Sequence, residues 1–565
     1  MAIRLANVSG GLNAVSSMQQ PPAVLLKRSG FGSRSILGGE RQGARLSSLP
    51  DDVLLLIISY IGVDDIVALR KTSKRFSSVT KLRWVWSDAL KHHILDKSIP
   101  LPTPIADIPL LTAKELEICA LHAARFHGNW CSDHPRPRRC VEFQIHKSED
   151  EDAPPQVEPE GLSRAHPHAV SQVIFLPGRN GELLITVSGM NRVVCWEVPL
   201  RGSEAFVVAE RTLPFGRKLD GLIVNEDPSN EAMLVLAHSM ALTRPPSPNG
   251  VVSTKTLEAW SLDRFHGRFN VLCKRTNLQG PSAPLYCLRG DRAILSDPIA
   301  VWSWRRPENF YRLLSSQPPV PMNDSVLAAK LIRNHVLVVR QGYINLLPVL
   351  EFDEDGLPLA STVPLAAGFL PLPRLAKEAI IVEHELAGEE RCQWQFNPLT
   401  ILLRVCEGGR EYIRKIDAHP RPEGSVPAEV QGHMGIANLP CMFSVPAQIY
   451  PVAPSCANFV VGRNGKGFWL ETRNQTNGRS VHAARCFVGF DVKASLVDVV
   501  EKDRQPRKEW ALDLCTRDKE VYATKVGMGE ISTRQYRMVA FAMDDTVGRI
   551  VIGGRDGRIQ ILSFV

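Results

Sequence analysis

The best candidates for metal ligands lie between positions 127 and 140, where histidine and cysteine alternate: His127, Cys131, His134 and Cys140. Imidazole and thiolate are the groups that zinc prefers in proteins. Their spacing does not match a standard zinc-finger pattern, although the prolines between them can support a tight knuckle. We therefore predict no metal site and interpret these side chains as ordinary contacts between neighbouring domains, with zinc binding as the alternative.

Two further patterns resemble catalytic motifs only at first sight. The run Gly462-Arg-Asn-Gly-Lys-Gly467 lacks the spacing of a phosphate-binding loop, and no helical pattern follows it to supply an N-terminal dipole, so it is typical of a hairpin turn. The pair His384-Glu385 lacks the second histidine of a zinc-protease helix, and the sequence contains no GxSxG elbow. We predict no enzymatic activity and no cofactor.

Length and composition indicate a globular protein with several domains. The chain has 565 residues, whereas a single hydrophobic core stops growing near ~250 to 300 residues. It is 44% hydrophobic and 22% charged, and no apolar run reaches the ~20 residues that span a bilayer. We expect no membrane partner.

Charge and cysteine usage narrow the class further. The net charge of +8 is thin for this length and forms no basic stripe, so we predict no nucleic-acid binding. Twelve cysteines are scattered without a CxxC pair or a regular framework. They are typical of reduced thiols, and we expect the protein in the cytoplasm, the nucleus or both.

The first 45 residues are rich in glycine, serine and arginine and contain one acid, Glu40. A mitochondrial transit peptide has a similar composition, but Pro21, Pro22 and the glycines interrupt any amphipathic helix. We interpret this segment as a disordered tail.

Short helices are predicted from residue 50 onward. Pro50, Asp51 and Asp52 favour a helix start, and Val53, Leu56, Ile57, Tyr60 and Ile61 form one apolar stripe. Leu54, Leu55 and Ile58 widen this stripe beyond what one buried side needs, so a second side requires burial. We expect Gly62 to end this helix, Asp64 to cap the next, and Thr72 or Ser73 to cap a third. Three helices this short bury their apolar surface poorly alone, which implies a partner.

These residues resemble the F-box. The resemblance covers Leu46-Ser-Ser-Leu49-Pro50-Asp-Asp-Val53, then Ile57, Ile61, Asp65-Ile66, Leu69, Thr72-Ser-Lys-Arg-Phe76 and Trp84-Val-Trp86. In that family the motif binds a Skp-type adaptor, which passes the protein to a cullin. The resemblance implies seven docking residues: Leu49, Pro50, Val53, Ile57, Leu69, Phe76 and Trp86. This sequence has a second tryptophan, Trp84, which leaves open which indole takes the family's position.

The rest of the chain divides into a helix and a long β region. Residues 112 to 127 are predicted to form a helix that begins with a capping box, Thr112 and Glu115, and acts as a spacer. From about residue 168 short apolar runs alternate with Gly, Pro, Asn and Asp, which predicts an all-β region. Residues 173–196 align without a gap with residues 539–562, an offset of 366 (539 minus 173).

The repeated unit resembles a WD-type propeller blade, and counting similar units gives about seven blades. Either the C-terminal strand or a strand near residue 170 can close the ring. The predicted fold is therefore a multidomain protein with a small helical F-box followed by an all-β propeller. Its predicted parts are a disordered tail (1–45), the F-box (46–95), a helical spacer (96–148), an acidic and proline-rich linker (149–168) and the β-propeller (169–565).

The resemblance implies a substrate-recognition adaptor of a Skp-cullin-F-box ubiquitin ligase. Its F-box would bind the Skp-type adaptor and cullin assembly, and its propeller would bind a protein target whose identity the sequence does not give. The alternative is a scaffold that pairs with the Skp-type adaptor outside any ligase.

Overall fold

The computed structural model describes residues 46, 49–97, 99–103, 105–132, 135–145, 168–189, 191–202, 204–214, 216–240, 254–278, 284–295, 299–313, 324–350, 368–372, 374–384, 397–420, 441–443, 449–452, 457–476, 481–499, 507–523 and 538–565. It divides into two compact units, Met1–Pro50 and Asp51–Val565, and all the elements below lie in the second. The predicted tail (1–45) and nearly all of the predicted linker (149–168) lie outside the described residues.

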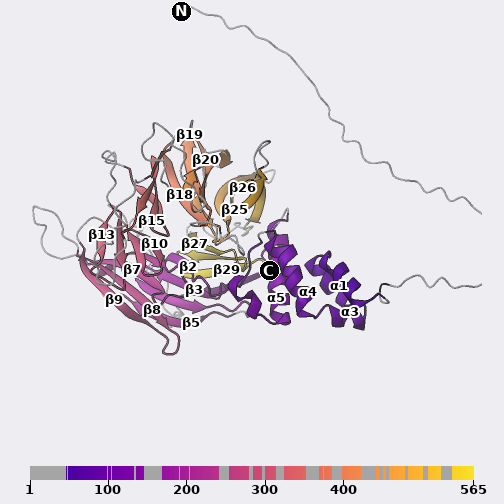
Figure 1. Ribbon diagram of the computed structural model, residues 1–565. Helices are drawn as coiled ribbons and strands as arrows, with labels where there is room; N and C mark the ends of the chain where they lie inside the picture. Colours follow the sequence, from indigo (N-terminus) through magenta and orange to yellow (C-terminus); the bar gives the residue numbers. More distant parts are fainter. Residues whose placement is uncertain are drawn as a thin grey trace, which may run out of the picture. The chain divides into compact units, whose positions relative to one another are not determined.

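Helices come first in the second unit (Figure 1): α1 (Asp51–Ser59), α2 (Val63–Arg70), α3 (Lys74–Val79), α4 (Arg83–Leu90), the π-helical turn η2 (Lys91–Leu95), the 3-10 helix η3 (Ile105–Leu110) and α5 (Ala113–Trp130). The predicted start of α1 is confirmed. Ser73 caps α3 by accepting a hydrogen bond from the backbone N–H of Phe76. The capping box of Thr112 and Glu115 at the start of α5 is also confirmed.

The boundary between α1 and α2 differs from the prediction. The first helix already ends at Ser59, and Gly62 is the residue that precedes α2 rather than the residue that stops α1. Asp64 lies inside the first turn of α2, so it does not cap that helix. Its carboxylate still lies near the positive end of the helix dipole, which gives an acidic residue the same preference for this region.

The helical core is centred on Trp86, which is fully buried among side chains of α1, α2, α3, α4 and α5. Its indole Nε1 donates a hydrogen bond to the carbonyl oxygen of Thr80 at 2.8 Å. Arg70 of α2 lies over the Trp86 ring and donates to Glu117 of α5 at 2.8 Å. The last helix is therefore part of the same core as the F-box helices. None of the helices that the structure describes is long and apolar enough to cross a bilayer.

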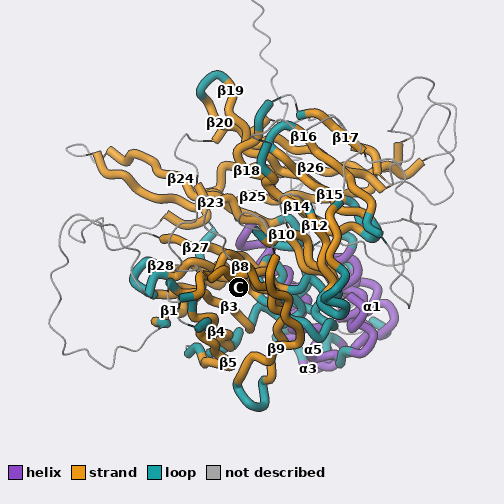
Figure 2. Tube along the Cα trace, turned by 90° about the vertical axis from the view of Figure 1, so that its left-hand side faces the viewer, coloured by secondary structure: helices purple, strands orange, loops and turns teal. Residues whose placement is uncertain are grey.

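Seven antiparallel sheets follow, as the sequence predicted, and each is one blade of a propeller. Figure 2 shows the strands around the ring. The blades are blade 1, β2 (Val170–Phe175), β3 (Leu183–Ser188), β4 (Arg192–Glu197) and β5 (Phe206–Thr212); blade 2, β6 (Arg217–Val224), β7 (Leu234–Met240), β8 (Thr254–Asp263) and β9 (Arg268–Leu278); blade 3, β10 (Leu285–Arg289), β11 (Arg292–Leu295), β12 (Ala300–Ser303) and β13 (Phe310–Arg312); and blade 4, β14 (Val326–Ile332), β15 (His335–Arg340), β16 (Tyr343–Pro348) and β17 (Gly368–Pro371).

The remaining blades are blade 5, β18 (Ala376–Glu383), β19 (Leu399–Glu407), β20 (Arg410–Pro420), β21 (Cys441–Phe443) and β22 (Ile449–Val452); blade 6, β23 (Ala457–Val461), β24 (Lys466–Thr476), β25 (Val481–Val499) and β26 (Arg507–Ala523); and blade 7, β27 (Met538–Asp544), β28 (Arg549–Gly554), β29 (Arg558–Ser563) and β1 (Arg139–Gln144). The repeat found in the sequence is confirmed, because β2, β3 and β4 occupy the same places in blade 1 as β27, β28 and β29 do in blade 7.

Ring closure corrects the predicted domain boundary. The outermost strand of blade 7 is β1, which pairs antiparallel with β29. The sequence analysis placed these residues in the helical spacer (96–148) and began the propeller at residue 169. The strand near residue 170, β2, is instead a member of blade 1. Because β1 lies at the outside of its blade, it buries only Val141 fully, so its sequence carries a weak strand signal.

Blade 7 is fastened to blade 1 by a buried guanidinium. Arg549 of β28 is 1% exposed and donates hydrogen bonds to the carbonyl oxygens of Gly181 (2.9 Å), Val198 (2.6 Å) and Pro199 (2.7 Å). Burial lowers the pKa of Arg549 to about 10. The three carbonyl groups replace the water that a buried cation loses, so they offset the cost of burying this guanidinium between blades 7 and 1.

Helix α5 reaches into the propeller at its C-terminal end. Phe126 and Trp130 are buried against blades 6 and 7, and the Trp130 ring meets the Phe564 ring edge-on at 5.5 Å. A Cβ at Gly548 would lie 2.4 Å from the Phe126 ring, so only glycine permits this approach. The predicted helix is confirmed, but it is a shared structural element rather than a detached spacer.

Candidate protein-docking surfaces

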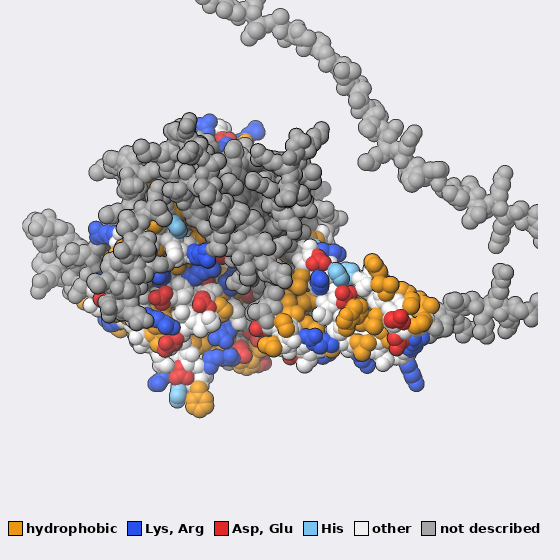
Figure 3. Space-filling view, in the orientation of Figure 1, with side chains coloured by type: hydrophobic (Ala, Val, Ile, Leu, Met, Phe, Trp, Pro, Cys, Tyr) orange, Lys and Arg blue, Asp and Glu red, His pale blue; other side chains and the backbone are white. Residues whose placement is uncertain are grey.

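The first surface is the outer side of α1. Val53, Leu56 and Tyr60 are 37%, 58% and 80% exposed, and their spacing of three and four residues aligns them along one side of the helix. We call these three residues the α1 stripe. Hydrophobic side chains gather on the helical part of the molecule over α1 and α3 (Figure 3). Contiguous apolar surface of this kind marks an interaction site.

The stripe exists because α1 is apolar on more than one side. The helical core takes Leu54 and Ile58, which are 1% and 2% exposed. The sequence analysis predicted an apolar surface wider than one side of the helix and did not say which side faces inward. The structure buries the side with Leu54 and Ile58 and leaves Val53, Leu56 and Tyr60 exposed.

The predicted docking residues fall into three groups. Leu49 and Pro50 belong to the first unit, where Leu49 is half-buried and Pro50 is exposed. Val53 is exposed, and Ile57 and Leu69 are half-buried, so these three can contact a partner. Phe76 and Trp86 are 6% and 0% exposed.

The two buried residues require a correction. Trp86 lies in the centre of the helical core and cannot reach a partner without unfolding it, whereas Trp84 is 52% exposed. Leu56 and Tyr60, the most exposed apolar residues of α1, were not among the predicted docking residues, because the sequence does not show which side of α1 faces α4. The signal that could have identified them is the surplus of apolar residues on this helix.

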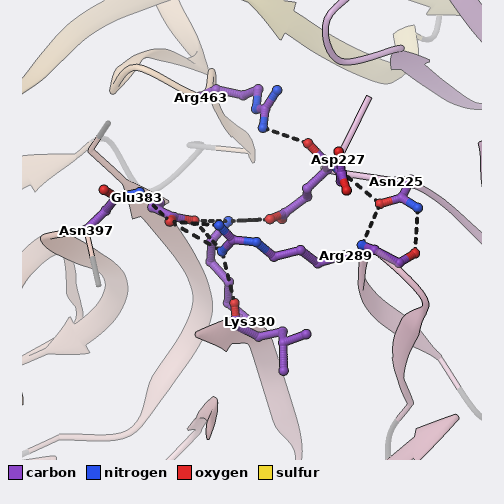
Figure 4. Close-up of polar contacts among 10 residues, drawn as sticks. Asn225, Asp227, Arg289, Lys330, Glu383, Asn397 and Arg463 are labelled. Atoms are coloured by element: carbon purple, nitrogen blue, oxygen red, sulfur yellow. Dashed lines mark hydrogen bonds and ion pairs between the residues drawn. The ribbon is translucent and has the colours of Figure 1, made fainter. Parts of the chain in front are cut away.

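The second region of concentrated polar chemistry crosses the centre of the propeller (Figure 4). Lys330 of blade 4 contacts both carboxylate oxygens of Glu226 from blade 2, at 2.9 and 3.0 Å. Arg289 of blade 3 donates to Glu383 of blade 5 at 3.0 Å, and Asn397 donates to Glu383 at 2.8 Å. The Lys330–Glu226 and Arg289–Glu383 ion pairs join blades that are not neighbours in the ring.

Electrostatics stabilises the charged forms in this central cluster. Burial alone would raise the pKa of Glu383, but the positive charges of Lys330 and Arg289 outweigh it and lower that pKa. Burial would lower the pKa of Lys330, and Glu226 and Glu383 raise it instead. Paired ions of this kind brace the ring and offer no group with a pKa moved toward neutrality for acid–base catalysis.

The other motifs have structural roles. The Gly462–Gly467 run is a hairpin turn between β23 and β24, as predicted, and the N–H of Gly462 donates to the carbonyl of Lys466 at 2.8 Å. His384 is buried and bonds to Thr400 at 2.9 Å, while Glu385 lies outside the described residues.

The residues considered as alternative zinc ligands lie on different elements. At the end of α5, the Sγ atom of Cys131 lies 3.7 Å from Nδ1 of His127, and Cys140 lies on β1. His134 is outside the described residues. Among the residues that the structure describes, no group of three or more His, Cys, Asp or Glu side chains is arranged to hold a metal ion.

A comparison with protein families finds the F-box domain at residues 46–88. The same residues form the helices α1 to α4 with the exposed stripe, and seven blades follow them. The chain is an F-box protein with a seven-bladed β-propeller. F-box domains generally bind a Skp-type adaptor, and the combination with a propeller is typical of non-enzymatic substrate adaptors.

Solved structures with a similar trace are distant from this F-box protein. The β-propeller domain of Cps50 (Swd1) from Myceliophteria thermophila is 11% identical, with a TM-score of 0.34, and covers 70% of this chain and 97% of its own. The WD40 domain of SCAP from fission yeast is 9% identical, with a TM-score of 0.35, and covers 70% and 95%. No curated protein sequence matches the chain significantly. The assignment of the propeller therefore depends on its own sheet topology.

Proposed function

We propose that this F-box protein is the substrate-recognition adaptor of a Skp-cullin-F-box ubiquitin ligase. The observation that carries the proposal is the α1 stripe, whose Leu56 and Tyr60 are more than half exposed on the first helix of the F-box domain. Exposing these side chains to water is unfavourable, and burying them against an adaptor removes that cost. The propeller would then hold the target protein.

The rigidity of α5 supports this role. Its first half packs in the helical core through Leu116, Ala120 and Ala123, and its last turn is buried in the propeller. A continuous helix between the two parts fixes the distance between a docked adaptor and a bound target. Fixed geometry favours transfer, because the target's lysine must stay within reach of a tethered enzyme. Such a role would place the protein in the cytoplasm or the nucleus.

Co-purification tests the proposal. The full chain is co-expressed with a Skp-type adaptor and a cullin, and compared with the variant Leu56→Ala/Tyr60→Ala. We expect a stable complex with the intact protein and an affinity for the adaptor about 30-fold weaker or worse in the variant, as for interface hot spots. Ile118→Ala is the control, because Ile118 is 41% exposed on α5, away from the α1 stripe in sequence.

The possible results separate the roles. No adaptor binding by the intact chain would disprove the docking function. Adaptor binding without the cullin would replace the ligase role with that of a scaffold. Equal binding by the intact chain and the double variant would show that another surface meets the adaptor.

A further inference from the structure

A surface cavity of about 600 Å³, widely open to solvent, lies between blades 4 and 5. It is lined by Gln341, Arg374, Leu375, Ala376, Lys377 and Cys406. A volume of this size suits a small ligand or a few residues of a peptide. We call it the blade 4/5 cavity.

The cavity lies at the end of the ring opposite to α5. Gln341 follows the second strand of blade 4 (β15), and Cys406 is near the end of the second strand of blade 5 (β19). In contrast, Nε2 of His122 in α5 lies 3.1 Å from the carbonyl oxygen of Val547, which follows the first strand of blade 7 (β27). Equivalent turns lie at the same end of a propeller, and the second strand runs from one end to the other. The turn between β19 and β20 and helix α5 are far apart in both views (Figures 1 and 2).

Positive charge is available at the mouth of this cavity. Arg374 and Lys377 have side chains that are 63% and 50% exposed. Their acidic partners, Glu407 at 3.6 Å and Glu411 at 2.8 Å, are held by other cations as well.

Those other cations are two arginines deeper in blade 5. Arg414, whose side chain is 14% exposed, pairs with Glu407, and Arg404, at 19%, pairs with Glu411 at 3.1 Å and with Glu378 at 3.0 Å. The four cations therefore face three carboxylates. These two arginines offset two of the three acidic charges, so the four cations together keep an excess of one positive charge. Arg374 and Lys377 can therefore accept a further anion while Glu407 and Glu411 each keep an arginine partner.

The adjoining acidic residue of blade 4 has its own partners. Asp324 accepts the N–H of Gly342 through its side chain at 3.1 Å, and its carbonyl accepts a hydrogen bond from Arg340 at 2.8 Å. It is thus anchored to its own blade. Arg340 beside it brings one positive charge for the one negative charge of Asp324, so the excess of one cation around the cavity, four against three, is unchanged.

Apolar surface lies next to these cations. Leu375, between them in sequence, is 69% exposed, and Ala376 beside it is buried at the start of β18. Gln341 supplies an amide that can bond to a peptide backbone. The cavity therefore combines a hydrophobic contact with two exposed cations, an arrangement that suits extended peptides.

We propose that the blade 4/5 cavity binds an extended peptide segment of the target protein in which an apolar side chain is flanked by carboxylates. This inference rests on the proposed function, because the peptide belongs to the protein that the propeller holds. The apolar side chain packs on Leu375, and the carboxylates pair with Arg374 and Lys377. A peptide bound here lies at the end of the ring that the helices leave open.

A panel of labelled peptides tests this site on the full chain. The probes are short peptides with a central Leu or Phe flanked by Asp or Glu, and matched peptides with Asn or Gln in place of the acids, measured by fluorescence polarisation. We expect the acidic peptides to bind about tenfold more tightly than the amide peptides. Added salt is expected to reduce this difference.

Variants identify the cavity as the site. Arg374→Glu/Lys377→Glu is expected to abolish the preference for acids, while Leu375→Ser weakens peptides with Leu or Phe but not those with Ala at the centre. Arg264→Glu/Arg268→Glu is the charge-matched control, because these two side chains are 52% and 64% exposed in blade 2. Unchanged thermal midpoints show that the variants are folded.

The exposed Cys406 gives a second readout. Its reaction with a maleimide is expected to slow when an acidic peptide is present, whereas that of Cys140, exposed on β1, is unchanged. The proposal is overturned if no peptide binds up to about 1 mM, if acids and amides bind alike, or if the double variant binds like the intact chain. Adaptor binding is measured on the same samples, so a failure here is distinct from a failure of the F-box docking.

Discussion

Helices α1 and α5 are both amphipathic, yet they dispose of their apolar surface differently. Helix α5 buries its apolar side along its whole length, first in the helical core and then in blades 6 and 7. Helix α1 buries one side and leaves Val53, Leu56 and Tyr60 exposed. The comparison shows how a structural helix differs from a docking helix. The first has its partners inside the chain, and the second keeps an exposed apolar side that the proposed adaptor would cover.

The largest expected effect concerns the end of α5 that is buried in the propeller. Trp130→Ala removes a buried indole that packs against Phe126 and Phe564. We expect it to lower the free energy of unfolding by about 3–5 kcal/mol, because the cavity left behind cannot collapse fully. Urea denaturation measures this loss. A loss below about 1 kcal/mol would mean that α5 is loosely attached to the propeller.

A pH-dependent effect probes the same junction from the propeller side. Asp545, in the turn that α5 contacts through Val547, is fully buried, and burial raises its pKa to about 7. Its carboxylate accepts the N–H groups of Asn464 (2.8 Å) and Lys466 (3.1 Å), which ties blade 7 to blade 6.

The sign of the effect follows from linkage. The folded protein holds this proton more tightly than the unfolded chain does, so Asp545 lowers stability as pH rises from about 4 to about 7, by at most about 1.4 kcal/mol per pH unit. Asp545→Asn lacks this slope, and its stability relative to the intact protein should rise over that range and then level off. Urea midpoints at several pH values measure it. A difference independent of pH would contradict the raised pKa.

A smaller effect concerns the start of α5. Thr112→Ala removes the hydroxyl that accepts the N–H of Glu115 and breaks the capping box. We expect a loss of about 1 kcal/mol in the free energy of unfolding. The matched variant is Ser73→Ala at the start of α3, where one cap bond is lost. If neither variant changes the unfolding midpoint, the caps are replaced by water at no cost.

The smallest expected effect on stability concerns the exposed side of α1. Tyr60→Ala should change the free energy of unfolding by no more than about 0.5 kcal/mol, because the side chain is 80% exposed. The same change should weaken binding of a purified Skp-type adaptor, measured by calorimetry. Destabilisation comparable to that of Trp130→Ala would show that Tyr60 belongs to the fold and not to a docking surface.

Much of the architecture was predictable because it is local. Helix caps, the F-box spacing and the strands of each repeat are set by residues close together in sequence. The sequence predicts the capping box at Thr112, a cap at Thr72 or Ser73 and a repeat at an offset of 366 (539 minus 173), and the structure confirms them with Ser73 as the cap, whereas the predicted cap Asp64 lies inside α2. The candidate docking residues were predicted only in part. Val53 and Ile57 remain accessible, whereas Phe76 and Trp86 are buried.

The sequence by itself determined that α1 has more apolar surface than one neighbour can bury and that the β region repeats. Only the tertiary structure decided that Leu54 and Ile58 face inward, that β1 closes the ring against β29, and that Gln341 and Cys406 lie in one cavity with residues 374–377. The physical reason is that sequence patterns are local, whereas packing depends on contacts between residues far apart in the sequence. A helical period records which residues share a side, but the neighbour that covers that side comes from a distant part of the chain.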